Sequence, residues 1–263
     1  MSATGGPGVR IDLEGAVALV TGSSRGIGAR TAILLARANA SVVLHCARNR
    51  EAADGVSAEI RATTGRSSPI LSGDLADEAV RRQIHRDAVR LAGPPLILVH
   101  NAGIYVMNPF QEPDDALFLK RWRTTMNVNL EAAAHLTLLA LPAMRQAHFG
   151  RIVMVSSRSA FRAETDAPDY AASKAGMVSL ARSLARKEGP NGITANSVCP
   201  GWVDTEMASE GLAREGEAIR AEIPLGRVAT PEDVAGAVLF LVSPLGAYLN
   251  GAALPLNGGS FLH

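Results

Sequence analysis

Short runs of apolar residues recur along the chain, separated by longer segments in which apolar and polar positions follow a helical period. The short runs are rich in Val, Ile and Leu and do not alternate with polar residues, which is typical of strands covered on both faces. They predict strands at residues 16–22, 41–47, 68–74, 96–103, 151–157, 193–201 and 252–259. The longer segments predict helices over residues 28–38, 51–64, 76–91 and 169–188.

This alternation indicates an α/β fold of the Rossmann type, a doubly wound parallel sheet of about seven strands with helices on both faces. No repeat, linker or low-complexity block divides the 263 residues, so we expect a flexible tail at residues 1–10 and one domain over residues 11–263. The least regular stretch, residues 204–227, is charged and contains glycine, and we expect it to form a small substrate lid. In such sheets ligands bind outside the carboxyl ends of the strands, so the chemistry should lie there.

The composition is ordinary for a soluble globular protein, with 47% hydrophobic residues, 19% charged residues and a formal net charge of +1. This balance does not favour nucleic acid or a membrane surface as a partner. We expect neither a secretory signal nor a transmembrane helix, because no apolar run is long enough. Cys46 and Cys199 fall in predicted strands and suit reduced core thiols of a cytoplasmic protein. No metal site is predicted.

A glycine-rich turn follows the first predicted strand. Its sequence, "VTGSSRGIGAR", has glycines at Gly22, Gly26 and Gly28 and leads into a helix. Glycines allow a tight turn and a close approach of backbone to pyrophosphate, and the helix N-terminus offers free N–H groups and a positive dipole end. The pattern therefore indicates a dinucleotide site, with a simple tight connection as the alternative.

Tyr170 and Lys174 lie four positions apart in a predicted helix, in a chain with only three tyrosines and three lysines. Side chains at this spacing share one face of a helix. A nearby ammonium favours phenolate, so we expect Lys174 to lower the pKa of Tyr170 from about 10 and to suit it for general acid–base catalysis. The alternative is a half-buried tyrosine packed on a lysine stem.

With these motifs in place, the sequence resembles the short-chain dehydrogenase/reductase family over nearly its whole length. The family's T-G-x-x-x-G-x-G is present at residues 21–28, its N-A-G at residues 101–103 and its Y-x-x-x-K at residues 170–174. The family's catalytic serine lies thirteen residues before the tyrosine, which selects Ser157, and its catalytic asparagine precedes a leucine, which selects Asn129. Motifs in this order and at these separations are together far more specific than any one alone.

The resemblance implies a catalytic set of Asn129, Ser157, Tyr170 and Lys174. Tyr170 would give a proton to the carbonyl oxygen during hydride transfer, and Ser157 would hydrogen-bond the same oxygen. Lys174 would also bind the nicotinamide ribose, and Asn129 would hold a water that links Lys174 to solvent. The alternatives are that Asn129 only ties two strands together and that Ser157 only caps a turn.

The resemblance also implies cofactor contacts beyond the glycine turn. Asp74 in "GDL" would meet the adenine, residues 101–103 would line the other side of the cofactor, and Thr205 in "CPGWVDTEM" would reach the nicotinamide carboxamide. The full set of implied cofactor-binding residues is Gly22, Ser24, Arg25, Gly26, Ile27, Gly28, Arg48, Asp74, Leu75, Asn101, Ala102, Gly103, Tyr170, Lys174, Pro200, Gly201, Val203 and Thr205.

The end of the second strand favours NADP(H) over NAD(H). The family's NAD-type aspartate corresponds to Cys46, and no acid is nearby. Arg48 follows, and Arg25 lies inside the glycine turn, so two guanidiniums could bind the 2′-phosphate through charge-assisted hydrogen bonds. NAD(H) stays possible if both arginines are only solvated surface charges.

Within the family, the chain is most similar to 3-oxoacyl-ACP reductases through "GRIVMVSS", "HCARN" and "PEDVA". This implies reduction of a ketone or 3-oxo group to a secondary alcohol, or the reverse. Carrier reductases place basic docking residues just before "GRI" and "GIT", where this chain has His148, Phe149 and Asn191. Acyl carrier protein is therefore an alternative to a small free carbonyl substrate. A protein that senses NADPH without turnover is an alternative of another class.

The substrate side and the assembly are less defined by the sequence. Phe161 and Trp202 suggest an apolar wall for the substrate. The long helical regions at residues 112–146 and 169–188 carry apolar residues on more than one face, and the resemblance implies that they pack between subunits of a homotetramer, with a dimer as the alternative. Asn257 stands where the family usually has an aspartate, and we expect it to affect a subunit contact.

Overall fold

The seven predicted strands form one parallel sheet, with neighbours in the order β3-β2-β1-β4-β5-β6-β7. The computed structural model describes residues 11–262, so the predicted tail at residues 1–10 lies outside the described residues. The strand order reverses between β1 and β4, which is the switch point where doubly wound folds bind ligands. The strands are β1 (Val17–Val20), β2 (Ser41–Cys46), β3 (Ile70–Ser72), β4 (Ile97–His100), β5 (Gly150–Val155), β6 (Ile193–Pro200) and β7 (Ala253–Leu256).

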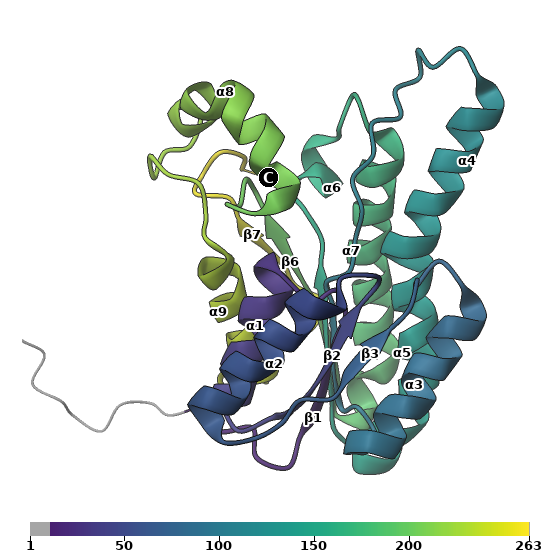
Figure 1. Cartoon of the computed structure of the whole chain (residues 1–263), viewed down its shortest axis with the longest axis vertical. Coiled ribbons are helices and arrows are strands. Elements are labelled where there is room, and N and C mark those ends of the chain that lie inside the picture. Colours follow the sequence, from purple (N-terminus) through teal and green to yellow (C-terminus); the bar gives the residue numbers. More distant parts are fainter. Residues whose placement is uncertain (1–10, 263) are drawn as a thin grey trace, which may run out of the picture.

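Helices cover both faces of this sheet (Figure 1). The first face is covered by α1 (Gly26–Arg37), α2 (Arg50–Thr64) and α9 (Pro231–Val242). The second face is covered by α3 (Glu78–Ala92), α5 (Ala132–Ala147) and α7 (Pro168–Glu188). Three further helices are α4 (Asp115–Met126), α6 (Ser159–Arg162) and α8 (Ser209–Ala221). The predicted Rossmann-type architecture is confirmed.

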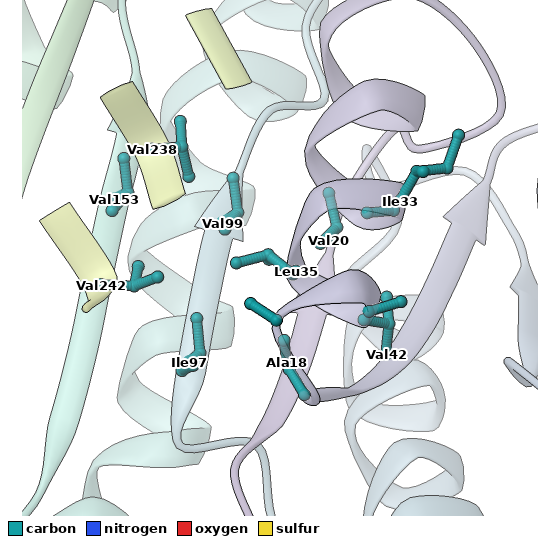
Figure 2. Close-up of a cluster of buried hydrophobic side chains, with 14 of the residues drawn as sticks. Ala18, Val20, Ile33, Leu35, Val42, Ile97, Val99, Val153, Val238 and Val242 are labelled. Atoms are coloured by element: carbon teal, nitrogen blue, oxygen red, sulfur yellow. The ribbon is translucent and has the colours of Figure 1, made fainter. Parts of the chain in front are cut away.

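Each central strand contributes alternate residues to two separate apolar cores. Ala18 and Val20 of β1 belong to the core beneath α1 and α9, and Figure 2 shows them with Val99 of β4 among their labelled neighbours. Val17 and Leu19 belong to the core on the opposite face. Because both sets are buried, the strand needs apolar residues at every position, which explains the continuous runs in the sequence.

The long helical region predicted at residues 112–146 is present but not uniform. Between α4 and α5 the chain makes a π-helical turn, η1 (Asn127–Glu131), without interrupting the helical path. Such turns insert an extra residue into a helix and are frequent at functional sites. Here the turn contains Asn129, whose side chain is buried.

The predicted lid is mostly helical. It consists of the 3-10 turn η3 (Glu206–Ala208) and α8, and a single bridge between Val203 and Ala229 joins its two ends. Figure 1 shows α8 above the end of the sheet formed by β6 and β7. Trp202 packs closely enough on α8 that a Cβ on Gly211 would meet its ring at 2.9 Å. That the segment closes over a substrate remains a prediction.

Candidate active site

The glycine turn after β1 exposes the N-terminus of α1. Gly22 and Gly26 have φ values of 64° and 54°, in the left-handed region that side chains disfavour. A Cβ on Gly28 would collide with the carbonyl oxygen of Gly22 and with Nδ2 of Asn101. The N-cap residue Arg25 makes no side-chain capping bond, and the first turn of α1 holds no acid. The turn thus fits the negative pyrophosphate of a dinucleotide.

A buried histidine holds this turn in place. The N–H of Gly22 donates to Nδ1 of His45 (3.1 Å), so Nε2 carries the ring proton and donates to the carbonyl of Gly73 (3.0 Å). The backbone of His45 also exchanges hydrogen bonds with Ser23. Burial lowers the pKa of His45, which favours the neutral ring that this bonding needs. Sequence reasoning missed His45, whose only signal is a polar residue in an apolar run.

Thr21 and Asn101 join the glycine turn to the end of β4. The Thr21 hydroxyl accepts from the N–H groups of Asn101 and Ala102, both at 3.0 Å. Nδ2 of Asn101 donates to the carbonyls of Thr21 (3.1 Å) and Gly22 (2.9 Å). The Asn101 side chain, predicted to line the cofactor, therefore braces the turn that would hold the cofactor.

The structure places the residues predicted to bind the cofactor at the carboxyl edge of the sheet and on α7. Arg25 forms an ion pair with Glu206 at the start of the lid, and both side chains are exposed. Arg48 is exposed and forms no ion pair with any described residue. Residues 22–28 follow β1, Arg48 follows β2, Asp74 and Leu75 follow β3, residues 101–103 follow β4, and Pro200, Gly201, Val203 and Thr205 lie at or after the end of β6.

The four predicted catalytic residues are brought together. A Cβ on Gly103 would lie 3.4 Å from both Oδ1 of Asn129 and Nζ of Lys174, so these two groups flank the same backbone position. The Lys174 ammonium is 5.6 Å from the centre of the Tyr170 ring. The Ser157 side chain is near enough to Tyr170 to lower the pKa of its phenol. Residues from η1, from the end of β5 and from α7 thus form one cluster.

The amide of Asn129 makes three hydrogen bonds to protein groups. Its Oδ1 accepts from the N–H of Ile104 (2.8 Å), and its Nδ2 donates to the Ile104 carbonyl (3.0 Å) and to Ser173 Oγ (3.0 Å). Asn129 therefore ties the segment after β4 to α7, which is close to the structural alternative that the sequence left open.

The expected lowering of the Tyr170 pKa is not found. Burial raises the pKa of Tyr170 to about 12, and the Ser157 side chain opposes this only in part. The Lys174 ammonium lies over the tyrosine ring and donates to the Val155 carbonyl (2.8 Å). Burial lowers the pKa of Lys174 itself to about 8. The helical spacing was correct, but the sequence could not show where the ammonium points or how much desolvation opposes it.

A chain of hydroxyl groups leads from the catalytic cluster to a carboxylate. Ser157 Oγ donates to Ser159 Oγ (3.1 Å), and Ser159 Oγ donates to Oε2 of Glu164 (3.2 Å). Ser157 Oγ also accepts from the N–H of Ser159 (3.1 Å). Glu164 raises the pKa of Tyr170 through its negative charge. Neither Ser159 nor Glu164 was predicted, because both are ordinary loop residues in the sequence.

Two aromatic residues and a C-terminal turn complete the substrate side. Tyr105 packs edge-on against Tyr170, with ring centres 5.1 Å apart. Asn257 is buried within its own chain: Nδ2 donates to the Phe261 carbonyl (2.6 Å) and Oδ1 accepts from the N–H of Gly259 (3.0 Å). That it affects a subunit contact stays a prediction. An amide supplies both a donor and an acceptor to this turn, which an ionised aspartate could not.

An uncapped helix N-terminus behind a glycine turn suits a dinucleotide, and a proton-bearing tyrosine near it suits hydride transfer at a carbonyl. Fold and site thus define a nicotinamide-dependent oxidoreductase.

Within residues 11–262 no cluster of three or more His, Cys, Asp or Glu could hold a metal ion. In the same range no helix has the length and apolar character needed to span a membrane.

Comparisons with known proteins specify the family. A family model described as enoyl-(acyl carrier protein) reductase matches residues 22–260. The chain is 36% identical to a 3-oxoacyl-[acyl-carrier-protein] reductase of Pseudomonas aeruginosa over 252 residues, 96% of this chain and 100% of that protein. It is 38% identical to an L-rhamnose 1-dehydrogenase (NAD(P)(+)) of a Sphingomonas species over 255 residues, 95% of this chain and 98% of that protein. The chain belongs to the short-chain dehydrogenase/reductase family.

A solved structure agrees with this assignment. It is the crystal structure of a candidate NAD(P)-dependent gluconate 5-dehydrogenase of Beutenbergia cavernae, with NADP bound at low occupancy. The TM-score is 0.87 and the identity 35%, over 96% of this chain and 99% of that chain. The protein is therefore an NAD(P)-dependent oxidoreductase that acts on carbonyl or alcohol groups.

Proposed function

We propose that the protein prefers NADP(H) and reduces the ketone group of a small free substrate to a secondary alcohol, with Tyr170 as the proton donor. The observation that carries this proposal is the cluster in which Lys174 lies 5.6 Å from the Tyr170 ring and, with Asn129, flanks Gly103 at the end of β4. With its pKa raised to about 12, the phenol keeps its proton at neutral pH and can give it to a carbonyl oxygen.

The catalytic residues divide the work around the substrate oxygen. When bound, the nicotinamide supplies the hydride. Tyr170 gives its proton to the substrate oxygen, and Ser157 holds that oxygen by turning its O–H from Ser159 toward it. Lys174, whose pKa burial lowers to about 8, would bind the nicotinamide ribose and return a proton to the tyrosinate. Asn129 holds the π-helical turn against α7 and would place the water that links Lys174 to solvent.

The preference for NADP(H) rests on charge at the end of β2. Cys46 is buried at the position where an acid would bind the ribose hydroxyls of NAD. Arg48 is exposed just beyond it, so its guanidinium is free to bind a 2′-phosphate. Arg25 could join it only by leaving Glu206. A solved relative holds NADP, which supports the same cofactor here. Equal catalytic efficiency with NADPH and NADH would contradict this preference.

Charge near the "GRI" segment supports a small substrate over acyl carrier protein. Arg145, the nearest basic residue before that segment, makes a two-pronged ion pair with the buried Glu188, at 2.9 and 2.7 Å. Asn191 donates to the same carboxylate (3.0 Å). Arg145 is therefore already neutralised, and His148 and Phe149 supply no fixed positive charge for an acidic carrier.

The first test is turnover of NADPH with the wild type and with Tyr170→Phe. We expect the wild type to reduce ketones from a panel of small ketones, β-keto esters and one acetoacetyl carrier-protein thioester. Tyr170→Phe should lower kcat at least about a hundredfold, the usual scale for losing a general acid. NADPH affinity should stay within about twofold, because the hydroxyl faces the substrate. A mutant that keeps more than half of the wild-type kcat would show that Tyr170 is not the proton donor.

The same panel separates the alternatives. Turnover of the thioester only in its carrier-bound form would assign the protein to acyl carrier protein chemistry. Tight binding of NADPH without turnover of any carbonyl compound would favour a regulatory role.

We also propose a cytoplasmic homotetramer. Leu119 of α4 and Leu138 of α5 are 42% and 64% exposed, and Leu245 and Tyr248, which follow α9, are 55% and 103% exposed, so apolar side chains are exposed in two regions of the sequence. Two different contact surfaces suit a tetramer with dihedral symmetry. Both cysteines are buried and unpaired, which suits a reducing compartment. Light scattering on the purified protein would distinguish a tetramer from a dimer.

A further inference from the structure

Arg158 is a half-buried guanidinium directly after the catalytic Ser157. Its N–H donates to the Pro200 carbonyl (2.8 Å), so its backbone is fixed between the ends of β5 and β6. Its Cζ lies 5.7 Å from the centre of the Trp202 ring, within cation–π distance. Nη1 donates to Ser260 Oγ (3.2 Å). Neither Arg158 nor Ser260 has a role in the reaction described above.

Within the residues that the structure describes, Arg158 forms no ion pair. Glu222 and Glu164 act on it through charge alone, and each has another partner: Glu222 pairs with Arg162 (3.5 Å), and Glu164 accepts from Ser159. Burial and the positive charge of Arg162 lower the pKa of Arg158. A guanidinium nevertheless stays charged in proteins, so a half-buried positive charge is maintained beside the catalytic serine.

The surroundings hold this guanidinium in one orientation. Trp202 lies against it, and Ser260 uses one of its five N–H donors. Ser260 sits on the turn that Asn257 stabilises, where the Ser260 N–H donates to the Asn257 carbonyl (3.1 Å). The remaining donors form a planar fork, which matches the two oxygens of a carboxylate.

We propose that Arg158 binds a carboxylate of the substrate, so that the natural substrate is an oxo acid or the corresponding hydroxy acid. This inference rests on the proposed function and narrows it. A neutral ketone would leave the half-buried guanidinium unpaired, whereas an oxo acid would pair it and place the carbonyl toward Ser157 and Tyr170. Arg158 acts in this proposal as a specificity residue, and no proton passes through it.

The test compares each acid with its own neutral ester on the same enzyme. The substrates are 3-oxobutanoate, 4-oxopentanoate and 5-oxohexanoate and their methyl esters, followed by oxidation of NADPH. For at least one chain length we expect the wild type to show kcat/KM about tenfold higher for the acid. In Arg158→Met this acid-to-ester ratio should fall by about tenfold to a hundredfold, the range for a lost charge-assisted hydrogen bond. Arg158→Lys, which keeps the charge but not the fork, should recover part of it.

Arg162→Met is the matched control. Arg162 is a nearby arginine that already has Glu222 as its partner, so the ratio should change by less than about twofold. Because Arg158 adjoins Ser157, absolute rates can change for local reasons, and the ratio cancels that effect. If Arg158→Met is inactive with both compounds, the ratio in Arg158→Lys decides.

An acid-to-ester ratio that is the same in wild type and in the Arg158 variants would overturn the inference while leaving the proposed function in place. A wild type that prefers every ester would do the same. A wild type that binds NADPH but reduces no acid and no ester would overturn the proposed function and this inference together.

Discussion

The two halves of the carboxyl edge of the sheet are built differently. The half formed by β1, β2 and β4 is held by neutral hydrogen bonds between buried groups, with Thr21, His45 and Asn101 at their centre. The half formed by β5, β6 and the lid holds charged residues, including Arg158, Glu164 and the exposed pair Arg25–Glu206 that bridges the two halves. The first half is suited to fix one cofactor in one pose, and the second to select among substrates.

This difference follows from what each half must recognise. A pyrophosphate is bound largely by backbone N–H groups, so its site depends on chain path and on glycines. A substrate is recognised by side chains on loops, which can change without altering the fold. Rigid neutral bonding in one half and adaptable charge in the other therefore reflect two different binding problems.

The largest effect is expected where the cofactor half is most tightly packed, at Gly28→Ala. The new methyl group would collide with the Gly22 carbonyl oxygen and with Asn101 Nδ2, which are hydrogen-bonded to each other. We expect NADPH affinity to fall by about tenfold to a hundredfold, because the N–H groups of the turn move off the phosphate position. Overpacking should also lower the free energy of unfolding by about 1–3 kcal/mol.

Gly55→Ala is the control for this change. Gly55 lies inside α2 with nothing within 4 Å of its would-be Cβ, so alanine should leave NADPH affinity unchanged. It should raise the free energy of unfolding by about 0.5–1 kcal/mol, since alanine is the better helix former. Calorimetric NADPH titration and urea unfolding measure both effects. Unchanged NADPH affinity in Gly28→Ala would show that the cofactor half is not rigid.

The sequence predicted the path of the backbone better than the orientation of side chains. The seven strands and the glycine turn after the first of them were predicted correctly in position, because continuous apolar runs and spaced glycines leave direct marks in the sequence. The four residues predicted to be catalytic lie together, but their roles stay predictions. The sequence did not predict the orientation of Lys174, the hydrogen bond that Glu164 accepts, or the lack of an ion pair at Arg158. Each of these depends on where a side chain points after folding. The desolvation of Tyr170 was not predicted for a similar reason. A spacing of four residues shows that Lys174 is a neighbour of Tyr170, but it does not show how far the phenol is shielded from water.

The next effect concerns Lys174, which lies where the two halves meet. Its pKa falls from 10.5 unfolded to about 8 folded, so the folded protein binds fewer protons than the unfolded chain between these values. The burial of its charge thus costs stability fully below pH 8, and this cost disappears as the pH rises toward 10.5. Lys174→Met should therefore raise the free energy of unfolding by about 2 kcal/mol at pH 7, after allowing for the hydrogen bond lost at Val155.

The gain should shrink as urea unfolding is repeated at rising pH between 8 and 10, while turnover is lost at every pH. Lys187→Met, at an exposed position of the same helix, should change the free energy of unfolding by less than about 0.5 kcal/mol. A Lys174→Met protein that is less stable than the wild type at pH 7 would mean that the ammonium is well compensated where it lies. The contrast between a neutral cofactor half and a charged substrate half would then need a different account.

The smallest effect is expected at Glu164, at the far end of the hydroxyl chain in the substrate half. The carboxylate raises the pKa of Tyr170, so Glu164→Gln should lower that pKa and shift the rise of alcohol oxidation to lower pH. At a fixed pH below this rise, oxidation should increase about twofold to fivefold, the range for a partly screened charge. Gln can still accept from Ser159, whereas Ser159→Ala removes the bond from Ser159 to Glu164, so comparing the two variants separates charge from hydrogen bonding. The opposite result would be a pH profile that matches the wild type in Glu164→Gln but shifts in Ser159→Ala. The hydrogen bonds from Ser157 to Glu164 would then act by positioning groups. The charges of the substrate half would serve to bind substrate and not to adjust the pKa of Tyr170.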